Sequence, residues 1–301
     1  MTLGDLIVDV AASAAGPLAH GSDRSGRVVF RQGGSAANTA RWVATSGGQA
    51  VFIGAVGRDD WGRRLGTSLI EAGVRTHLVA KRAPTARIVA LVEPGGERTF
   101  VTDRGAADLL VPSDLRPRWF AGAAALHLPA YALYSDRLAS AAQRAVELGR
   151  DAGAVVSVDL ASRQPILDLG AAEAWARVAA VEPDILFANE MEAEAILEGR
   201  SERELLDLAP LVVVKLGGAG CRVLARRGSS DVPLVVEVPT RPVAVTDTTG
   251  AGDAFAAGFL VRWLVPDGGR TATALRIQRA ARAGHRAAAR LLSNARRSLI
   301  A

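Results

Sequence analysis

The chain has 301 residues, of which 49% are hydrophobic and 22% are charged, as in ordinary globular proteins of one or two domains. Its hydrophobic runs fall short of the roughly 18 residues that span a membrane, so we expect no membrane partner. The net charge is +5, yet aromatic residues make up only 5% of the chain. That is too few for a surface on which bases stack, so we expect no nucleic-acid partner.

The N-terminal sequence and the cysteine content favour the cytoplasm. Asp5 and Asp9 stand where a secretory signal peptide has basic residues and then an apolar stretch. Cys221 is the single cysteine, so the chain cannot form an internal disulfide, which suits a reducing compartment.

Strand-like apolar runs alternate with helical stretches along the chain. We expect strands at residues 6–10, 51–56, 125–128, 155–160, 185–188, 211–216 and 243–246. We expect helices at residues 36–46, 62–72, 136–151, 190–197, 254–264 and 271–292. This alternation predicts an α/β fold with a mostly parallel central sheet and helices on both faces. Such sheets bind ligands at the carboxyl ends of their strands, where we expect Asp9, Asp159, Asn189, Gly217 and Asp247.

Two segments break this alternation. Residues 11–32 and 83–103 have no helical period, and the second alternates from Arg87, turns at 94–96 and returns from Arg98 as a hairpin. We expect them to form a small separate sheet beside a core of residues 1–10, 33–82 and 104–301. A sheet of this size has little core of its own, so we expect a partner to cover it.

The stretch TDTTGAGDAF, from Thr246 to Phe255, is the most informative part of the chain. It lies between a β-branched run and a helical stretch of small residues, so its glycines belong to a turn that opens a helix. Gly250 and Gly252 leave room for an anion beside the free N–H groups of the first helical turn. A bound anion would repel the carboxylate of Asp253. Its place there is therefore explained best by a part in the chemistry. We interpret Asp253 as a general base that takes a proton from a hydroxyl, with a helix cap as the alternative.

This stretch, continued to Gly258, resembles the C-terminal signature of the ribokinase-like (PfkB-type) carbohydrate kinases. GGSAANTA at 33–40, followed by the G-x-V-G-x-D-x-x-G pattern of 54–62, resembles the N-terminal signature of that family. NEME at 189–192 and KLGGAG at 215–220 resemble two further family motifs between them. The four motifs cover nearly the whole chain in the family's order. They imply a three-layer ribokinase-like fold in which the small separate sheet is a lid over the sugar.

The resemblance implies an ATP-dependent transfer of a phosphoryl group with Asp253 as the general base. Gly250, Ala251 and Gly252 would supply backbone N–H groups to the phosphoryl group in transit. The chain has no G-x-x-x-x-G-K-S/T motif, which excludes the P-loop mode of binding ATP.

The resemblance places the sugar at the N-terminal signature. Asp9 can accept hydrogen bonds from two neighbouring hydroxyls, and Asn38 offers both a donor and an acceptor. Gly33 and Gly34 permit a close approach of the substrate. A turn cap at Asp9 and a helix cap at Asn38 are the alternatives to these roles.

ATP and Mg²⁺ are expected at the two middle motifs. Asn189 and Glu192 resemble the family's N-x-x-E motif, and Glu192 is expected to reach Mg²⁺ through water. The nucleotide-binding loop of the family corresponds to Lys215, Gly217, Gly218 and Gly220. Lys215 has an equally good interpretation as a simple charge at the end of a strand.

Members of the family often bind K⁺ beside the anion hole. Asp247 and Thr249 match the first half of that site. The second half is not recognisable in residues 293–301, so the sequence leaves K⁺ dependence open.

Other polar residues have simpler interpretations. Arg87 and Arg104 lie in or beside the lid, where arginines are usually at the surface. His127 ends a strand and is interpreted as a satisfied residue at the edge of the core. For Asp159, a structural role is favoured over a place in the pocket.

These observations predict a cytoplasmic, ATP-dependent sugar kinase with a magnesium cofactor, joined through its lid into a homodimer. A nucleoside or pseudouridine kinase of the same fold is the alternative. A non-catalytic nucleotide- or sugar-binding regulator is the alternative of another class, but such a regulator has no use for the carboxylate of Asp253. The sequence does not identify the acceptor.

Overall fold

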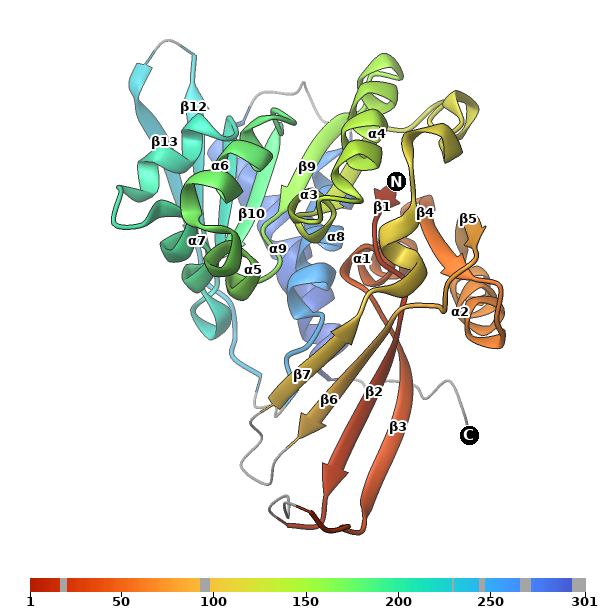
Figure 1. Cartoon of the computed structure of the whole chain (residues 1–301). Coiled ribbons are helices and arrows are strands. Elements are labelled where there is room, and N and C mark those ends of the chain that lie inside the picture. Colours follow the sequence, from red (N-terminus) through yellow and green to blue (C-terminus); the bar gives the residue numbers. More distant parts are fainter. Residues whose placement is uncertain (17–20, 93–97, 229, 244–246, 266–271, 294–301) are drawn as a thin grey trace.

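The computed structural model describes residues 1–16, 21–92, 98–228, 230–243, 247–265 and 272–293. Within these ranges the main sheet contains nine strands, and the segment from β11 to β5 is parallel (Figure 1). In spatial order they are β13 (Ser230–Val238), β12 (Cys221–Arg227), β11 (Leu211–Lys215), β10 (Ile185–Asn189), β9 (Val155–Asp159), β8 (Ala125–Pro129), β1 (Thr2–Leu3), β4 (Ala50–Gly57) and β5 (Val74–Lys81). β12 and β13 are antiparallel and close one edge.

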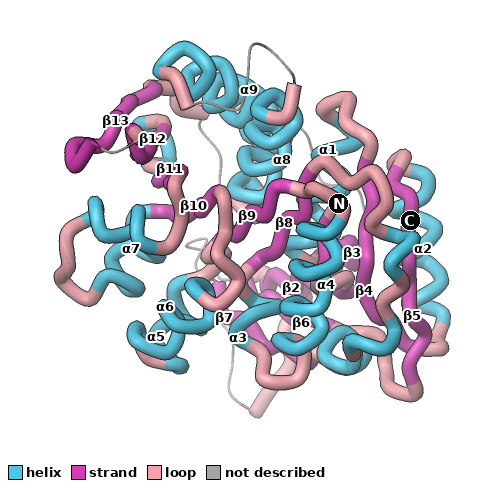
Figure 2. The backbone as a smooth tube through the Cα atoms, turned by 90° about the horizontal axis from the view of Figure 1, so that it is seen from above, coloured by secondary structure: helices cyan, strands magenta, loops and turns pink. Residues whose placement is uncertain are grey.

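Helices cover both faces of this sheet, as seen from above in Figure 2. One face carries α1 (Ser35–Thr45), α2 (Asp60–Glu71), α8 (Ala251–Trp263) and α9 (Ala274–Leu292). The other carries α3 (Tyr131–Tyr134), α4 (Ala139–Asp151), α5 (Arg163–Leu169), α6 (Ala171–Ala179) and α7 (Glu190–Leu197). The strands between them are buried on both sides, which explains their continuous apolar runs. The predicted three-layer α/β architecture is confirmed.

A second sheet forms the lid below the main sheet in Figure 1. Its order is β3 (Gly26–Gly33), β2 (Ile7–Ala14), β6 (Arg87–Val92) and β7 (Arg98–Asp103). At the base of the lid the Phe30 ring stacks on Trp61 of α2, with ring centroids 5.3 Å apart. The expected small separate sheet is therefore present, and an aromatic contact joins it to the core.

The first strand differs from its prediction. We expected one strand at 6–10 in the main sheet, with Asp9 at its end, but the main sheet contains only Thr2–Leu3 of this region. The chain crosses between the sheets at residues 4–6, and the lid strand begins at Ile7. The cause is that Leu6, Ile7 and Val8 are buried at the junction, so one apolar run conceals the change of sheet.

The other elements were predicted with uneven success. β5, β12, β13, α3, α5 and α6 were missed. β5 and β13 are the edge strands of the sheet, and the three helices are short, with 4, 7 and 9 residues. Residues 244–246 of the strand expected at 243–246 lie outside the described residues. Among the helices that the structure describes, none is long and apolar enough to cross a membrane.

The carboxyl ends of β9, β10 and β11 meet at the edge that faces the lid. Phe187 of β10 lies beside Asp159, and Asn189 lies beside Lys215. The parallel register therefore brings three polar side chains, each from the last residue of its strand, to one place.

The residue two positions after Asp159 has a strained backbone. Ala161 has φ 63°, in the left-handed region where a Cβ atom costs about 1–2 kcal/mol. Its N–H donates to Oδ1 of Asp159 at 3.1 Å, so the strained turn helps to hold that carboxylate.

We predict that Ala161→Gly raises stability by about 0.5–1 kcal/mol, because relief of the strain exceeds the added entropy of the unfolded chain. The midpoint of thermal unfolding should rise by about 1–3 °C. Glu198→Gly is the matched control, since Glu198 ends α7 with φ 48° and has no place in the turn at Asp159. A lower midpoint for Ala161→Gly than for the parent chain would contradict the prediction.

Candidate active site

A cavity of about 1510 Å³ lies between the lid and the carboxyl ends of the strands. Residues of the lid, of the strand ends and of the turn before α8 line it together. With one exception, every site residue predicted from the sequence lines this cavity: Asp9, Gly33, Gly34, Asn38, Asn189, Glu192, Lys215, Gly217, Gly218, Gly220, Thr249, Gly250, Ala251, Gly252 and Asp253. The exception, Asp247, lines an adjoining cavity of about 220 Å³ on the inner side of the lid.

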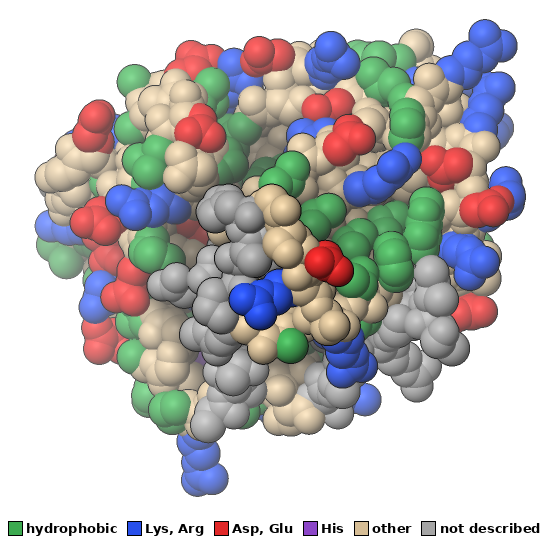
Figure 3. All heavy atoms as spheres, turned by 60° about the horizontal axis from the view of Figure 1, so that its bottom comes forward, with side chains coloured by type: hydrophobic (Ala, Val, Ile, Leu, Met, Phe, Trp, Pro, Cys, Tyr) green, Lys and Arg blue, Asp and Glu red, His purple; other side chains and the backbone are tan. Residues whose placement is uncertain are grey.

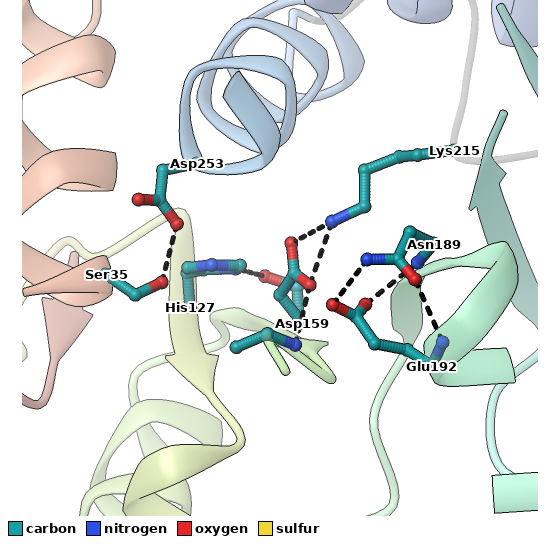
Figure 4. Close-up of polar contacts among 9 residues, drawn as sticks. Ser35, His127, Asp159, Asn189, Glu192, Lys215 and Asp253 are labelled. Carbon is teal, nitrogen blue, oxygen red and sulfur yellow. Dashed lines mark hydrogen bonds and ion pairs between the residues drawn. The ribbon is translucent and has the colours of Figure 1, made fainter. Parts of the chain in front are cut away.

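Two side chains of α1 hold the carboxylate of Asp253, and Figure 4 shows the contact from Ser35. The Ser35 hydroxyl donates to Oδ1 at 2.6 Å, and Nδ2 of Asn38 donates to Oδ2 at 3.0 Å. Asn38 was predicted as a sugar ligand; its Nδ2 contacts Asp253, and the residue also lines the cavity, so that prediction stays open. Ser35 received no role from the sequence, although it stands inside the N-terminal signature that points to this site.

Burial raises the pKa of Asp253 to about 6, and the hydrogen bonds from Ser35 and Asn38 oppose that rise. A carboxylate in this range is ionised at neutral pH and is a stronger base than an exposed aspartate. The site therefore contains a fixed carboxylate whose proton affinity suits proton transfer.

The turn before α8 presents backbone N–H groups to the cavity. Gly250 precedes the helix in the left-handed conformation, with φ 83°, which favours glycine. The N–H of Ala251 donates to the carbonyl of Thr248 at 3.1 Å, so the predicted role of Ala251 as a donor to phosphate needs correction. The N–H groups of Gly252 and Asp253 have no acceptor among the described residues, which leaves both available as hydrogen-bond donors at the cavity.

Lys215 and Asp159 form a buried ion pair at the strand ends (Figure 4). Nζ of Lys215 lies 2.9 Å from Oδ1 and 2.7 Å from Oδ2 of Asp159. Asp159 is 2% exposed and lines the cavity. The sequence had favoured a structural role for Asp159 over a place in the pocket. Lys215 also lines the cavity, and its ammonium group is paired with this carboxylate.

Asn189 and Glu192 open α7 as a reciprocal cap. Oδ1 of Asn189 accepts from the Glu192 N–H at 2.9 Å, and Oε2 of Glu192 accepts from the Asn189 N–H at 2.8 Å. Glu192 is 3% exposed, and this burial raises its pKa to about 7, against the opposing effect of Lys215. The cap places a carboxylate of high proton affinity at the wall of the cavity.

The lid end of the cavity contains Asp9 and Arg104. Asp9 is 8% exposed and lies within β2, opposite Arg31 of β3. Arg104 was expected at the surface, but its guanidinium group is paired with Asp5 at 2.8 Å and with Asp108 at 2.7 Å. Its charge is thus balanced by carboxylates.

His127 lies beneath the strand ends. It is 2% exposed, and its Nδ1 lies 3.0 Å from the Ser157 hydroxyl. Its Nε2 has no partner, so only one ring nitrogen of this buried histidine is satisfied.

Asp247 joins the turn to the lid. Its Oδ1 accepts from the Thr249 N–H at 3.0 Å, and its Oδ2 lies 3.5 Å from Nη1 of Arg31 in β3. The carboxylate of Asp247 is thus near a positive charge of the protein itself. The K⁺ site expected at Asp247 and Thr249 stays a prediction, and residues 294–301 lie outside the described residues.

The sequence matches the family of pfkB family carbohydrate kinases over residues 1–296. It is 32% identical to fructokinase-1 of Oryza sativa subsp. japonica, an alignment that covers 89% of this chain and 83% of that protein. It is 34% identical to a fructokinase of Klebsiella pneumoniae, over 86% and 82% of the two chains.

Among solved structures, the adenosine kinase from Sinorhizobium meliloti superposes with a TM-score of 0.81 at 27% identity, over 99% of this chain and 96% of that one. Four motifs, a cavity lined by them and matches along nearly the whole chain thus agree. The chain belongs to the pfkB family of carbohydrate kinases and is a phosphotransferase that acts on an alcohol group.

Proposed function

We propose that the chain transfers the γ-phosphoryl group of ATP to a hydroxyl of a small carbohydrate, with Asp253 as the general base. One observation carries this proposal. A carboxylate with a raised pKa lies at the start of α8, next to N–H groups without acceptors, and both face one cavity. A base and an anion site side by side are what phosphoryl transfer to an alcohol needs.

In the proposed step the acceptor oxygen attacks the γ-phosphorus. The new bond joins this oxygen to phosphorus while the bond from phosphorus to the β,γ-bridging oxygen breaks, and ADP leaves with that electron pair. The hydroxyl proton passes to Asp253. The N–H groups of Gly252 and Asp253 hold the charge on the phosphoryl oxygens. Ser35 and Asn38 fix the base, so little reorganisation is needed during the transfer.

The nucleotide is assigned to the turn after β11. Gly217 and Gly220 have φ 55° and 112° there, and a Cβ atom at Gly220 would lie 2.2 Å from the carbonyl oxygen of Val238. Both conformations favour glycine, and Gly220 also needs it in order to pack against β13. Both glycines line the cavity, where ribose and phosphate can lie against their backbone.

Glu192 suits a magnesium ion held through water. It is a buried carboxylate at the cavity wall, and both of its oxygens are oriented by Asn189. The described residues contain no group of three or more His, Cys, Asp or Glu side chains that could hold a metal ion. Mg²⁺ usually keeps several water ligands and binds through one or two carboxylates and the substrate phosphates. When bound, Mg²⁺ would neutralise charge on the ATP phosphates. No step is assigned to K⁺.

The acceptor is assigned to the lid end of the cavity, against Asp9, Gly33 and Gly34. Gly34 has φ 98°, and a Cβ atom there would lie 2.2 Å from the Asp5 carbonyl oxygen. A carboxylate beside exposed backbone can bind neighbouring hydroxyls, and the fructokinase relatives support a sugar. A nucleoside is the second candidate, supported by the likeness to an adenosine kinase.

We predict that Asp253→Asn lowers turnover by about 10²–10⁴-fold, because the acceptor hydroxyl loses its proton acceptor. ATP affinity, measured by calorimetry, should change little. The acceptor is first chosen by thermal-shift screening of sugars and nucleosides with Mg²⁺ and an ATP analogue. Turnover by Asp253→Asn within about threefold of the parent would remove Asp253 as the base.

The pKa of Asp253 predicts the acid side of the pH profile. Because the base must be ionised, kcat/KM should fall as pH drops below about 6. The stability of the fold responds in the opposite sense. Because the folded state binds the proton of Asp253 more tightly than the unfolded state does, the stabilisation is fully present below the usual pKa of 3.8 and is lost as pH rises through about 6. The melting midpoint of Asp253→Asn relative to the parent should therefore be higher at neutral than at acid pH. A pH-independent difference would contradict this.

The outer face of the lid supports the proposed homodimer. Ala12, Val28, Val89 and Val101 share this face by register, while Val10 at the base of the same face packs against the core. Val28 is 58% and Val101 63% exposed, and a small sheet with an apolar face gains by covering it. Figure 3 views the molecule from the lid end, where hydrophobic side chains gather on the right. Basic and acidic side chains are mixed over the same face.

We predict that light scattering gives the mass of a dimer and that Val101→Lys gives a monomer, because a charge cannot be buried in the apolar contact. Ile70→Lys is the matched control, since Ile70 of α2 is 61% exposed and outside the lid. A parent chain that is monomeric at micromolar concentration, or a dimer that both substitutions leave intact, would exclude assembly through this face.

A further inference from the structure

The ammonium group of Lys215 has an unusual position. Lys215 is the last residue of β11, and its side chain is only 14% exposed. An ammonium group has three N–H donors, and the two acceptors given for Nζ are both oxygens of Asp159. One donor direction is thus left without a protein acceptor among the described residues, in a group that lines the cavity.

The start of α8 lies on the other side of this ammonium group. A Cβ atom built on Gly252 would lie 3.1 Å from Nζ of Lys215. The N–H of Gly252 is one of the donors without an acceptor at this turn. An anion held by that N–H group would therefore lie within reach of the third N–H of Lys215.

The charges around Lys215 favour a role in binding anions over a purely structural one. Asp159, Glu192 and Asp253 all interact electrostatically with it, so the cavity already contains more carboxylates than cations at this point. The transferred phosphoryl group adds further negative charge, which is costly in a buried place without a cation. A structural pair with Asp159 alone would not need to contact the turn.

We propose that Lys215 is a catalytic residue, whose ammonium group binds the phosphoryl oxygens during transfer, and that Asp159 is the residue that positions it. The inference rests on the proposed phosphoryl transfer. It adds to that step a positive charge, the ammonium group of Lys215, beside the phosphoryl oxygens. Asp159 is itself fixed by the Ala161 N–H and by its place between β8 and β10. The ammonium group is thus held in advance at the place where charge develops.

The chain offers a matched control, because Lys81 is its only other lysine. Lys81 is also paired with one carboxylate, Asp114, at 2.6 Å, and its side chain is 18% exposed, but it does not line the cavity. Lys215→Gln and Lys81→Gln therefore remove the same charge from similar pairs.

We expect Lys215→Gln to lower kcat by about 10²–10³-fold with ATP affinity changed less than about threefold, since the contact acts in transfer. Lys215→Arg, which keeps the charge, should recover at least about tenfold of that loss. Lys81→Gln should leave kcat within about twofold. The complex of ADP with aluminium fluoride, which imitates the phosphoryl group in transit, should weaken far more in Lys215→Gln than ADP alone.

Removing Lys215 leaves a buried carboxylate unpaired, and the single variant could fail to fold. The double variant Lys215→Gln with Asp159→Asn removes both charges and keeps hydrogen-bonding groups, so it tests the proposal in that event. A folded double variant should show the same loss of kcat.

The outcomes separate the two proposals. If Lys215→Gln, or the folded double variant, keeps kcat within about threefold of the parent while Asp253→Asn is inactive, the role of Lys215 is wrong and the kinase function stands. Equal weakening of ADP alone and of its aluminium fluoride complex would likewise overturn it. A parent chain that phosphorylates none of the screened acceptors would instead reject the proposed function.

Discussion

The organisation of the site depends on the cost of gathering carboxylates in one buried cavity. Asp159, Glu192 and Asp253 all line it, and burial raises the pKa of both Glu192 and Asp253. Each carboxylate has a different compensation: Lys215 for Asp159, the backbone and side chain of Asn189 for Glu192, and two side chains of α1 for Asp253. Because these partners come from separate elements, the site forms only when both helical layers are in place.

The partners of the carboxylates differ in charge. Asp159 has a full positive charge beside it, whereas Asp253 accepts from two neutral donors, and burial raises the pKa of Asp253 to about 6 in spite of them. The same cavity can thus contain one carboxylate that fixes a cation and another that exchanges a proton near neutrality. The sequence does not show which carboxylate has which role, because the roles depend on the side chains that contact each carboxylate.

Sequence reasoning succeeded where chemistry is local. The turn at Gly250 that opens a helix, with Asp253 in the first helical turn, was predicted from the local sequence and is present. The reciprocal cap of Asn189 and Glu192 was not predicted, although their spacing of three residues is the one that such a cap needs. Sequence reasoning failed where chemistry depends on contacts between distant segments. Ser35 and Asp253 are 218 positions apart, and Asp159 and Lys215 are 56 apart, so no local pattern predicts either contact. Likewise Arg104 resembles a surface arginine until Asp5, 99 positions away, is seen beside it.

The way in which the lid joins the core limits how it can move. Four short crossings connect them among the described residues: between β1 and β2, between β3 and α1, between β5 and β6, and between β7 and the turn of helix at Gly105–Leu109. Two of them are single residues, Gly34 and Arg104, and both line the cavity. The strands are anchored at their bases and hydrogen-bonded to one another, so we expect the lid to move as one unit rather than strand by strand. A tilt of that unit would be transmitted through Gly34 and Arg104 to the residues that line the acceptor end.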